Sequence, residues 1–257
     1  MEKIKYRYQI IALAVFIVLF GVVLMTYADQ ENGGYITTPE PASLALISTG
    51  GFFGFLVRFA RRRFEQFKRC FDVVVSLVAI VVTAPLVAVT AAIIKIVSPG
   101  PVFFKQERVG RGGTLFNIYK LRTMKINAEK YTGPMWAREN DPRLIKFGQG
   151  IRKSHVDELP QLVNVLRGEM SIVGPRPERP VFVKQLEEQI PDYLRRLKVK
   201  PGITGLAQVW HKYDETIQDV KKKIKYDLLY IRKMCLMVDL RILLRTILVV
   251  ARGQGAR

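Results

Sequence analysis

The residues best suited to chemistry in this chain are an adjacent acid pair, Asp157 and Glu158, and an arginine, Arg176, that stands between two prolines. A carboxylate can act as a nucleophile or hold a metal ion, and a guanidinium can grip phosphate with two parallel hydrogen bonds. Placed close together, these groups are the parts needed to handle a phosphorylated substrate. Each also has a plainer interpretation, so the elements that carry them must be considered.

The acid pair stands at the predicted start of an amphipathic helix. Apolar residues recur at helical spacing over residues 159–166, and Gly168 is a typical helix end. Pro160 is tolerated only in a first turn, so the helix is predicted to begin near Asp157. Free amide donors and the helix dipole favour anions there, whether the carboxylates themselves or a bound phosphate. For an acidic residue at a helix start alone, capping is the commoner explanation.

Arg176 belongs to the tetrapeptide GPRP at residues 174–177. Each proline fixes its own φ and pushes the preceding residue into an extended conformation. The pattern therefore predicts a stiff backbone that presents the guanidinium as a bidentate phosphate clamp. A rigid loop with a solvated arginine is the alternative.

The charge of the chain indicates a polyanionic partner. Among its 257 residues, 41 Lys and Arg stand against 22 Asp and Glu, a net charge of +19. Nucleic acid, anionic lipid and a phosphorylated substrate would all suit this charge. A nucleic-acid-binding protein would need a basic stripe with stacking aromatics or a known reader motif, and neither is visible. The two cysteines, Cys70 and Cys235, indicate no disulfide framework or zinc site, and we expect buried, reduced thiols.

Two apolar segments near the N-terminus predict a transmembrane helical hairpin. Residues 10–26 contain no charge, and residues 42–57 form a second apolar run. The residues between them, 27–41, carry acidic side chains and no Lys or Arg, whereas both outer flanks are basic. By the positive-inside rule, both ends of the hairpin lie in the cytoplasm.

A third apolar run, residues 71–97, carries Pro85 in its middle. As a third span it would export the basic C-terminal part, against the positive-inside rule. Two half-helices meeting at residues 83–85 would instead enter the membrane and return to the same face. A proline-kinked ordinary span is the alternative, since kinked spans are tolerated in lipid.

The part of the chain after residue 97 reads as a small mixed domain. Its expected strands 102–106 and 116–121 flank a glycine turn that is more typical of a hairpin than of a phosphate loop. The other expected elements are a long polar excursion over 126–150, a strand over 206–210, a charged helix over 214–233 and an interfacial helix over 236–251.

Six blocks of this sequence occur in the order typical of one protein family. They are KRCFDVVVSL, the apolar run with its proline, SPGPVFFKQERVG, FNIYKLRTM, NDPRLIKFGQGIRKSHVDELPQLVNVLRGEMSIVGPRPERP and VKPGITGLAQV. Over roughly residues 69–257 the chain thus resembles the bacterial sugar transferases, the monotopic phosphoglycosyl transferases that start lipid-linked glycan assembly. The sequences PERPVFV and GAR look most like exopolysaccharide- or capsule-initiating members.

The resemblance implies roles for the residues that match the family's motifs. Asp157 and Glu158 match the catalytic acid pair, which also implies that they hold Mg²⁺, and Arg176 matches the phosphate-binding arginine. Further basic residues in matching blocks are expected to complete the phosphate cradle: Lys120, Arg122 and Arg152. The implied reaction moves a sugar 1-phosphate, of the hexose kind, from a UDP-sugar to undecaprenyl or another polyprenyl phosphate. It releases UMP and passes through a phosphosugar-aspartate at Asp157.

The expected fold is therefore α/β, membrane-associated and mostly helical. A transmembrane hairpin over residues 1–65 precedes a catalytic domain over 66–257, which holds the re-entrant helix 71–97, a short β-hairpin and interfacial helices. We expect the bacterial inner membrane, with the catalytic domain on the cytoplasmic face. The expected partners are a nucleotide sugar, polyprenyl phosphate and anionic lipid, without nucleic acid; a homodimer is compatible with the sequence. A non-catalytic membrane scaffold or a membrane-tethered polyanion-binding protein is the alternative.

Overall fold

The computed structural model describes residues 40–130, 133–135, 141–210 and 217–252, with the backbone alone for residues 40–62. The chain divides into two units, Met1–Arg58 and Phe59–Arg257. The expected first span, residues 10–26, lies outside the described residues. The second apolar run, residues 42–57, is helical as part of α2.

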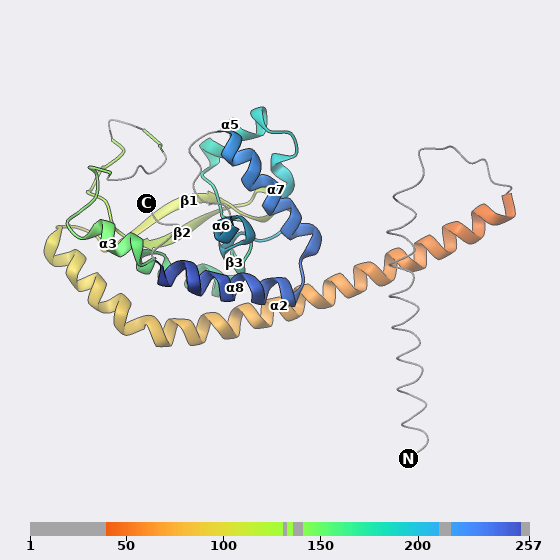
Figure 1. The fold of residues 1–257 in the computed structure, drawn as a ribbon, viewed down its shortest axis with the longest axis horizontal. Helices are drawn as coiled ribbons and strands as arrows, with labels where there is room; N and C mark the ends of the chain where they lie inside the picture. The colour runs from red at the N-terminus through yellow and green to blue at the C-terminus, as the bar shows by residue number, and fades with distance from the viewer. Residues whose placement is uncertain (1–39, 131–132, 136–140, 211–216, 253–257) are drawn as a thin grey trace, which may run out of the picture. The chain divides into compact units, whose positions relative to one another are not determined.

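Helix α2, Glu40–Val97, runs without interruption through Pro85. The predicted half-helices on either side of Pro85 are therefore parts of one helix, which bends (Figure 1). Proline removes one helical hydrogen bond, and hydroxyls that donate to carbonyls one turn back ease such bends. Thr83 donates to the Ala79 carbonyl at 2.6 Å and Thr90 to that of Leu86 at 2.8 Å. Within the described part, the segment Arg63–Val97 is long and apolar enough to cross a membrane, judged by length and composition.

Two small sheets organise the body that follows α2. Strand β1, Phe103–Val109, pairs antiparallel with β2, Leu115–Leu121, so the predicted hairpin is confirmed. Strand β3, Ser171–Val173, pairs in parallel with β4, Gly202–Thr204. The helical elements around them are η1 Arg111–Gly113, α3 Gly148–Lys153, η2 Val156–Gln161, α4 Leu162–Arg167, α5 Pro180–Gln189, η3 Tyr193–Lys198, α6 Leu206–Trp210, α7 Ile217–Lys233 and α8 Leu236–Ala251.

Several predicted elements need correction. The expected strand over 206–210 is the helix α6, because the Val209 amide donates to the Gly205 carbonyl at 3.2 Å and closes a helical turn. A short apolar run is ambiguous between strand and helix, and here the chain turns at Gly205. The helix at the acid pair begins as predicted but opens with the 3₁₀ segment η2 before α4. Cys70 and Cys235 are free but exposed, not buried.

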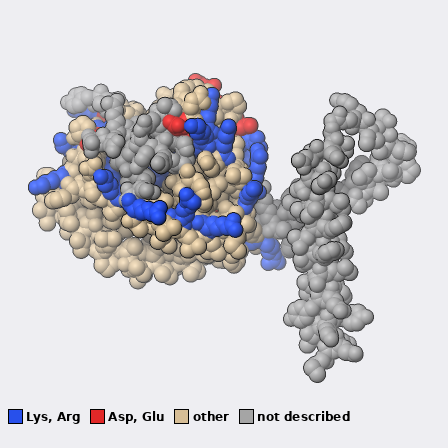
Figure 2. Space-filling model, in the orientation of Figure 1, with Lys and Arg blue, Asp and Glu red and all other residues tan. Residues whose placement is uncertain are grey.

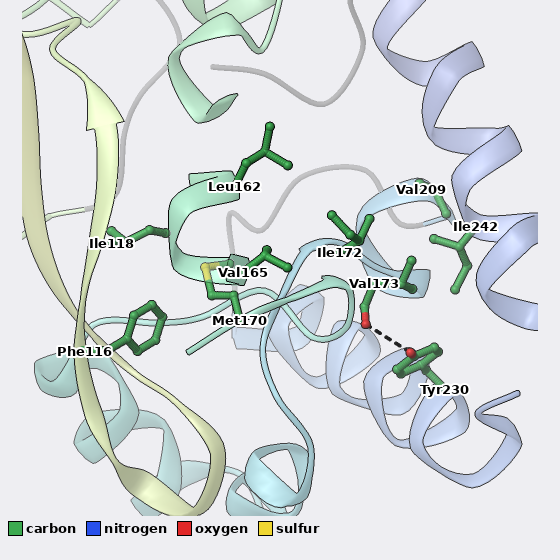
Figure 3. Close-up of a cluster of buried hydrophobic side chains, with 10 residues drawn as sticks. All are labelled: Phe116, Ile118, Leu162, Val165, Met170, Ile172, Val173, Val209, Tyr230 and Ile242. Atoms are coloured by element: carbon green, nitrogen blue, oxygen red, sulfur yellow. Dashed lines mark hydrogen bonds between the residues drawn. The ribbon is translucent and has the colours of Figure 1, made fainter. Parts of the chain in front are cut away.

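The main hydrophobic core lies between the β-hairpin, the β3–β4 sheet and the last two helices (Figure 3). Val165 of α4, Met170 and Ile242 of α8 are wholly buried in it. The Tyr230 hydroxyl of α7 donates to the Val173 carbonyl of β3 at 3.1 Å (Figure 3). Partly buried residues of α2 pack against the same cluster: Val75, Ala79 and Ile80. One core therefore holds this part of α2 to the body.

Polar contacts reinforce the attachment of α2. Lys68 pairs with Asp239 of α8 at 2.5 Å, Arg69 donates to the Leu166 carbonyl at 2.7 Å, and buried Asp72 accepts the Ile172 amide at 3.0 Å. The opposite face of α2 exposes large apolar side chains, among them Val81, Val82 and Ile96, and α8 exposes Leu244 and Ile247. In Figure 2, Lys and Arg side chains line the upper border of a broad uncharged surface. Such a border is typical of a protein resting on lipid.

Candidate active site

A cavity of about 1150 Å³ opens between the β-hairpin, η2, the loop after β3 and the helices α2, α5, α6 and α8. Its wall includes all six residues expected in the site: Lys120, Arg122, Arg152, Asp157, Glu158 and Arg176. Residues far apart in the sequence thus meet at one concave surface.

The acid pair is positioned by a tight turn and by β2. His155 adopts the left-handed conformation with φ 56°, which redirects the chain into η2. Fully buried Asn164 on α4 accepts the Tyr119 amide at 3.1 Å and donates to the Asn117 carbonyl at 2.7 Å. The asparagine thereby fixes β2 beside the helix that carries the acids, and Lys120 lies next to Glu158.

Glu158 is the centre of an ion-pair cluster. Lys120 Nζ lies 2.7 Å from Glu158 Oε1, and the two terminal nitrogens of Arg176 lie 2.5 Å and 3.3 Å from the two carboxylate oxygens. Burial alone would raise the pKa of Glu158, but Arg176 and Lys120 hold it well below its usual range. Glu158 is therefore held as an anion that orients two cations, Lys120 and Arg176.

Asp157 has a different electrostatic setting. Burial and the neighbouring Glu158 raise the pKa of its carboxyl to about 6, against the opposing pull of Lys120, Arg152 and Arg176. Arg152, whose Nε donates to Thr123 Oγ1 at 2.8 Å, contributes to that pull from α3. At neutral pH Asp157 is mainly ionised, and it is less stabilised as an anion than Glu158. That combination suits a nucleophile.

The loop of Arg176 is fixed by donors from outside it. Four successive carbonyls each accept a hydrogen bond: Pro175 from the Gly202 amide at 2.9 Å, Arg176 from Arg196 Nη2 at 2.7 Å, Pro177 from Arg108 Nη1 at 3.1 Å and Glu178 from the Val109 amide at 2.9 Å. Prolines supply no amide donors of their own, so this external set determines the loop's shape.

Two of those donors, Arg108 and Arg196, are functional residues that the sequence analysis missed. They are 69 and 20 residues away from their acceptors. Arg108 lies in the block SPGPVFFKQERVG, which could have pointed to it, whereas Arg196 lies in none of the six blocks. The glycines at positions 174 and 202 allow the backbones of these two loops to approach closely. A Cβ on Gly174 would lie 2.5 Å from the Lys200 carbonyl oxygen, and one on Gly202 would lie 2.1 Å from the Gly174 amide nitrogen.

Arg122 lines the cavity, but its guanidinium serves the backbone. Its terminal nitrogens donate to the carbonyls of Pro99 at 2.8 Å and Ser98 at 2.6 Å, and the side chain is 5% exposed. These bonds hold the turn where the chain leaves α2. Lys120, Arg152 and Arg176 surround the acid pair, whereas Arg122 secures the neighbouring wall.

The donor set at the acid pair fits Mg²⁺. Within the described residues, no group of three or more His, Cys, Asp or Glu could hold a metal ion. Magnesium, however, is usually held by one or two carboxylates together with substrate phosphates and water. Asp157 and Glu158 are carboxylates on the cavity wall, the ligand type of that pattern, and the Glu158 oxygens also contact Lys120 and Arg176.

Fold and site together define a mostly helical protein with an exposed apolar helix and a carboxylate–arginine site suited to phosphate chemistry. The family model of the bacterial sugar transferases matches residues 63–253, and the chain belongs to this family. The expected family is confirmed.

Three relatives illustrate the match. The UDP-N-acetylgalactosamine-undecaprenyl-phosphate N-acetylgalactosaminephosphotransferase of Aeromonas hydrophila is 45% identical over 190 residues, 74% of this chain and 45% of that protein. The UDP-glucose:undecaprenyl-phosphate glucose-1-phosphate transferase of Xanthomonas campestris pv. campestris is 44% identical over 177 residues, 68% of this chain and 37% of that protein. The exopolysaccharide production protein PSS of Rhizobium leguminosarum bv. phaseoli is 39% identical over 195 residues, 73% of this chain and 97% of that protein. This chain thus spans less than half of the first two relatives.

Proposed function

We propose that this protein transfers a sugar 1-phosphate from a UDP-sugar to undecaprenyl phosphate and releases UMP. The observation that carries the proposal is the cluster of Asp157, Glu158, Arg176 and Lys120 on the wall of one cavity that also reaches α2 and α8. The names of the relatives, which include undecaprenyl-phosphate sugar transferases, support the same reaction. Such a transfer would be a first membrane step in exopolysaccharide, capsule or O-antigen assembly.

The first step is a displacement at the phosphorus that bears the sugar. A carboxylate oxygen of Asp157 forms the new P–O bond, the bond to the bridging oxygen of the donor's diphosphate breaks, and UMP leaves with that oxygen. Asp157 suits this role because it is mainly ionised at neutral pH. Arg176 and Lys120, fixed around Glu158, are placed to stabilise the charge that develops on the transferred phosphate.

The second step returns Asp157 to its starting state. An oxygen of undecaprenyl phosphate attacks the same phosphorus, the bond to Asp157 breaks, and the product is an undecaprenyl diphosphate sugar. A carboxylate is a good leaving group for this exchange. Mg²⁺, held by Asp157 and Glu158 when bound, would neutralise phosphate charge. Arg152 contributes positive charge beside Asp157.

The membrane arrangement is part of the proposal. Residues 71–97 of α2 enter the inner membrane from the cytoplasmic face and return to it, and α8 lies at the same interface. The exposed apolar side chains of both helices support this, as does the bend of α2 (Figure 1). An acceptor with a lipid tail and a water-soluble donor would then meet at the level of the headgroups.

A turnover assay tests the proposal. Purified full-length protein is offered a panel of UDP-sugars with undecaprenyl phosphate and Mg²⁺, and the released UMP is measured. We expect UMP release with at least one UDP-hexose. Release of more than one UMP per protein molecule should require undecaprenyl phosphate. A lack of UMP release and of lipid-linked product with every donor would contradict it and would favour the non-catalytic scaffold.

A further inference from the structure

The cavity has two sides of different chemistry. Toward the exposed apolar helices it is lined by Leu86 of α2 and by Val249 and Val250 of α8. On the other side it is lined by residues 124–130, which follow β2, and by Arg179 and Phe182. Figure 1 shows α5 on the side of the body away from α2 and α8. The acid pair belongs to the wall of the same cavity.

An ion pair lies on the α5 side of the cavity. The terminal nitrogens of Arg179 donate to the two carboxylate oxygens of Glu129 at 2.8 Å and 2.9 Å. Arg179 also stacks its guanidinium over Phe182, 5.7 Å from the ring centre. A bidentate pair of this kind fixes orientation as well as distance. The pair connects residues 124–130, the roof segment, to the start of α5.

The same ion pair joins the roof segment to the loop of Arg176. Arg179 precedes Pro180, the first residue of α5, and follows Glu178, whose carbonyl is held by the Val109 amide at 2.9 Å. Glu178 in turn pairs with Lys223 at 3.2 Å and Arg108 at 3.6 Å. The roof segment is thus positioned relative to the phosphate-binding arginine by a short, rigid path.

We propose that this side of the cavity, under the roof segment, binds the nucleoside part of the donor, and that the Glu129–Arg179 pair is its positioning contact. This rests on the proposed function. The exposed Lys125, Asn127 and Lys130 give the roof segment hydrogen-bond donors, and exposed Ile126 together with Phe182 gives this side apolar surface, a combination that suits a nucleoside. The side toward α2 and α8, lined by Leu86, Val249 and Val250, suits the isoprenoid tail of the acceptor.

The experiment uses purified full-length protein and four variants. Glu129→Gln and Arg179→Gln each break the ion pair, and the exchange Glu129→Arg with Arg179→Glu restores it with reversed polarity and unchanged net charge. Arg195→Gln is the matched control, because Arg195 pairs with Asp192 at 3.0 Å on an exposed surface away from the cavity. Steady-state kinetics give KM for the UDP-sugar and for undecaprenyl phosphate. Calorimetric titration with UMP gives a Kd that needs no turnover.

We expect both single variants to raise the donor KM and the UMP Kd about 10-fold, because the residues of the roof segment are no longer held in place to contact the nucleoside. The KM for undecaprenyl phosphate should not change, and the exchange variant should recover most of the loss. Trypsin should cleave at Lys125 and Lys130 faster in the single variants than in wild type or Arg195→Gln, because the roof segment is released.

The inference is overturned if both single variants keep the wild-type UMP Kd, if the lipid KM rises instead, or if the exchange variant binds UMP as weakly as the single ones. Failure of the proposed function has a different signature. In that case wild type releases no UMP from any UDP-sugar, while UMP binding and its loss in the single variants are still measurable and support the site.

Discussion

The side chain of Arg196 donates to the backbone carbonyl of Arg176 at 2.7 Å, so one buried arginine fixes the backbone from which another reaches Glu158. Arg196 is held by Asp227 of α7 at 2.8 Å, and both side chains are almost wholly buried. Helix α7 therefore supports the loop of Arg176, although neither Arg196 nor Asp227 lines the cavity.

Arg196→Lys should reduce kcat by about 10-fold or more with little change in KM for either substrate, because lysine lacks the fork that reaches both the carbonyl and Asp227. The measurement is steady-state kinetics beside Arg195→Lys, a neighbouring exposed arginine. A variant that loses thermal stability but keeps the wild-type kcat would assign Arg196 to folding alone.

Asp157→Asn should abolish turnover while the protein remains folded, because a neutral amide cannot act as the nucleophile. Radiolabelled sugar phosphate should be trapped on wild-type protein and not on the variant. Asp192→Asn is a suitable control, since Asp192 is exposed and its left-handed conformation, φ 65°, suits asparagine. Substantial turnover by Asp157→Asn would rule out the covalent route.

Arg176→Lys should be far from conservative. The Arg176 guanidinium contacts both oxygens of Glu158. A lysine ammonium keeps the positive charge but cannot make the two parallel contacts. Loss of one transition-state contact corresponds to about 2–4 kcal/mol, or a rate loss on the order of a hundredfold or more. Single-turnover UMP release measures it. Rates close to those of wild type would limit Arg176 to a structural role.

Pro85→Leu should push α2 toward a form that crosses the membrane, because it removes the proline at the bend and favours a straight helix of spanning length. Single cysteines at positions 67 and 103 report the two ends of the segment, in a background where exposed Cys70 and Cys235 are replaced. In the protein that keeps Pro85, both positions should react only with membrane-permeant reagents. A cysteine at position 33 should react with impermeant ones. Labelling of 67 and 103 from opposite sides would contradict the re-entrant arrangement.

The protein should lose stability in acid as Glu178 becomes protonated. Burial alone would raise its pKa, but Lys223, Arg108 and Arg196 lower it from the ordinary value of 4.5 to about 2. A carboxyl with a lowered folded-state pKa stabilises the fold fully above pH 4.5, and this contribution is lost as the pH falls toward 2. At neutral pH it corresponds to about 3 kcal/mol. Thermal unfolding of wild type and Glu178→Gln in detergent should therefore differ at pH 7, keep part of that difference at pH 3 and converge near pH 2; a constant difference would contradict the assignment.

Much of the candidate site follows from local patterns. The apolar spacing after Asp157 and the position of Pro160 predict the helix that carries the acids, and Gly168 ends it in the left-handed conformation with φ 83°. The glycine turn predicts the hairpin that brings Lys120 to the cavity. These predictions depend on periodicity and backbone constraints that act within a few residues.

The failures have a common cause. The short segment 206–210 carries no decisive period, and the turn at Gly205 made it a helix. Pro85 removes a hydrogen bond from α2, but the helix stays continuous, and Val75, Ala79 and Ile80 pack it against the body. Local sequence could not weigh these tertiary contacts.

The sequence by itself determined the chemical parts and the class of protein: an acid pair at a helix start, an arginine between prolines, and apolar segments beside basic flanks. Only the tertiary structure decided which cations pair with Glu158, that Arg122 binds the backbone, and that Arg108 and Arg196 hold the loop of Arg176. The reason is physical. Residue type and short spacing fix local conformation, whereas the partners of a buried charge are chosen by the packing of elements distant in the chain, which leaves no local pattern.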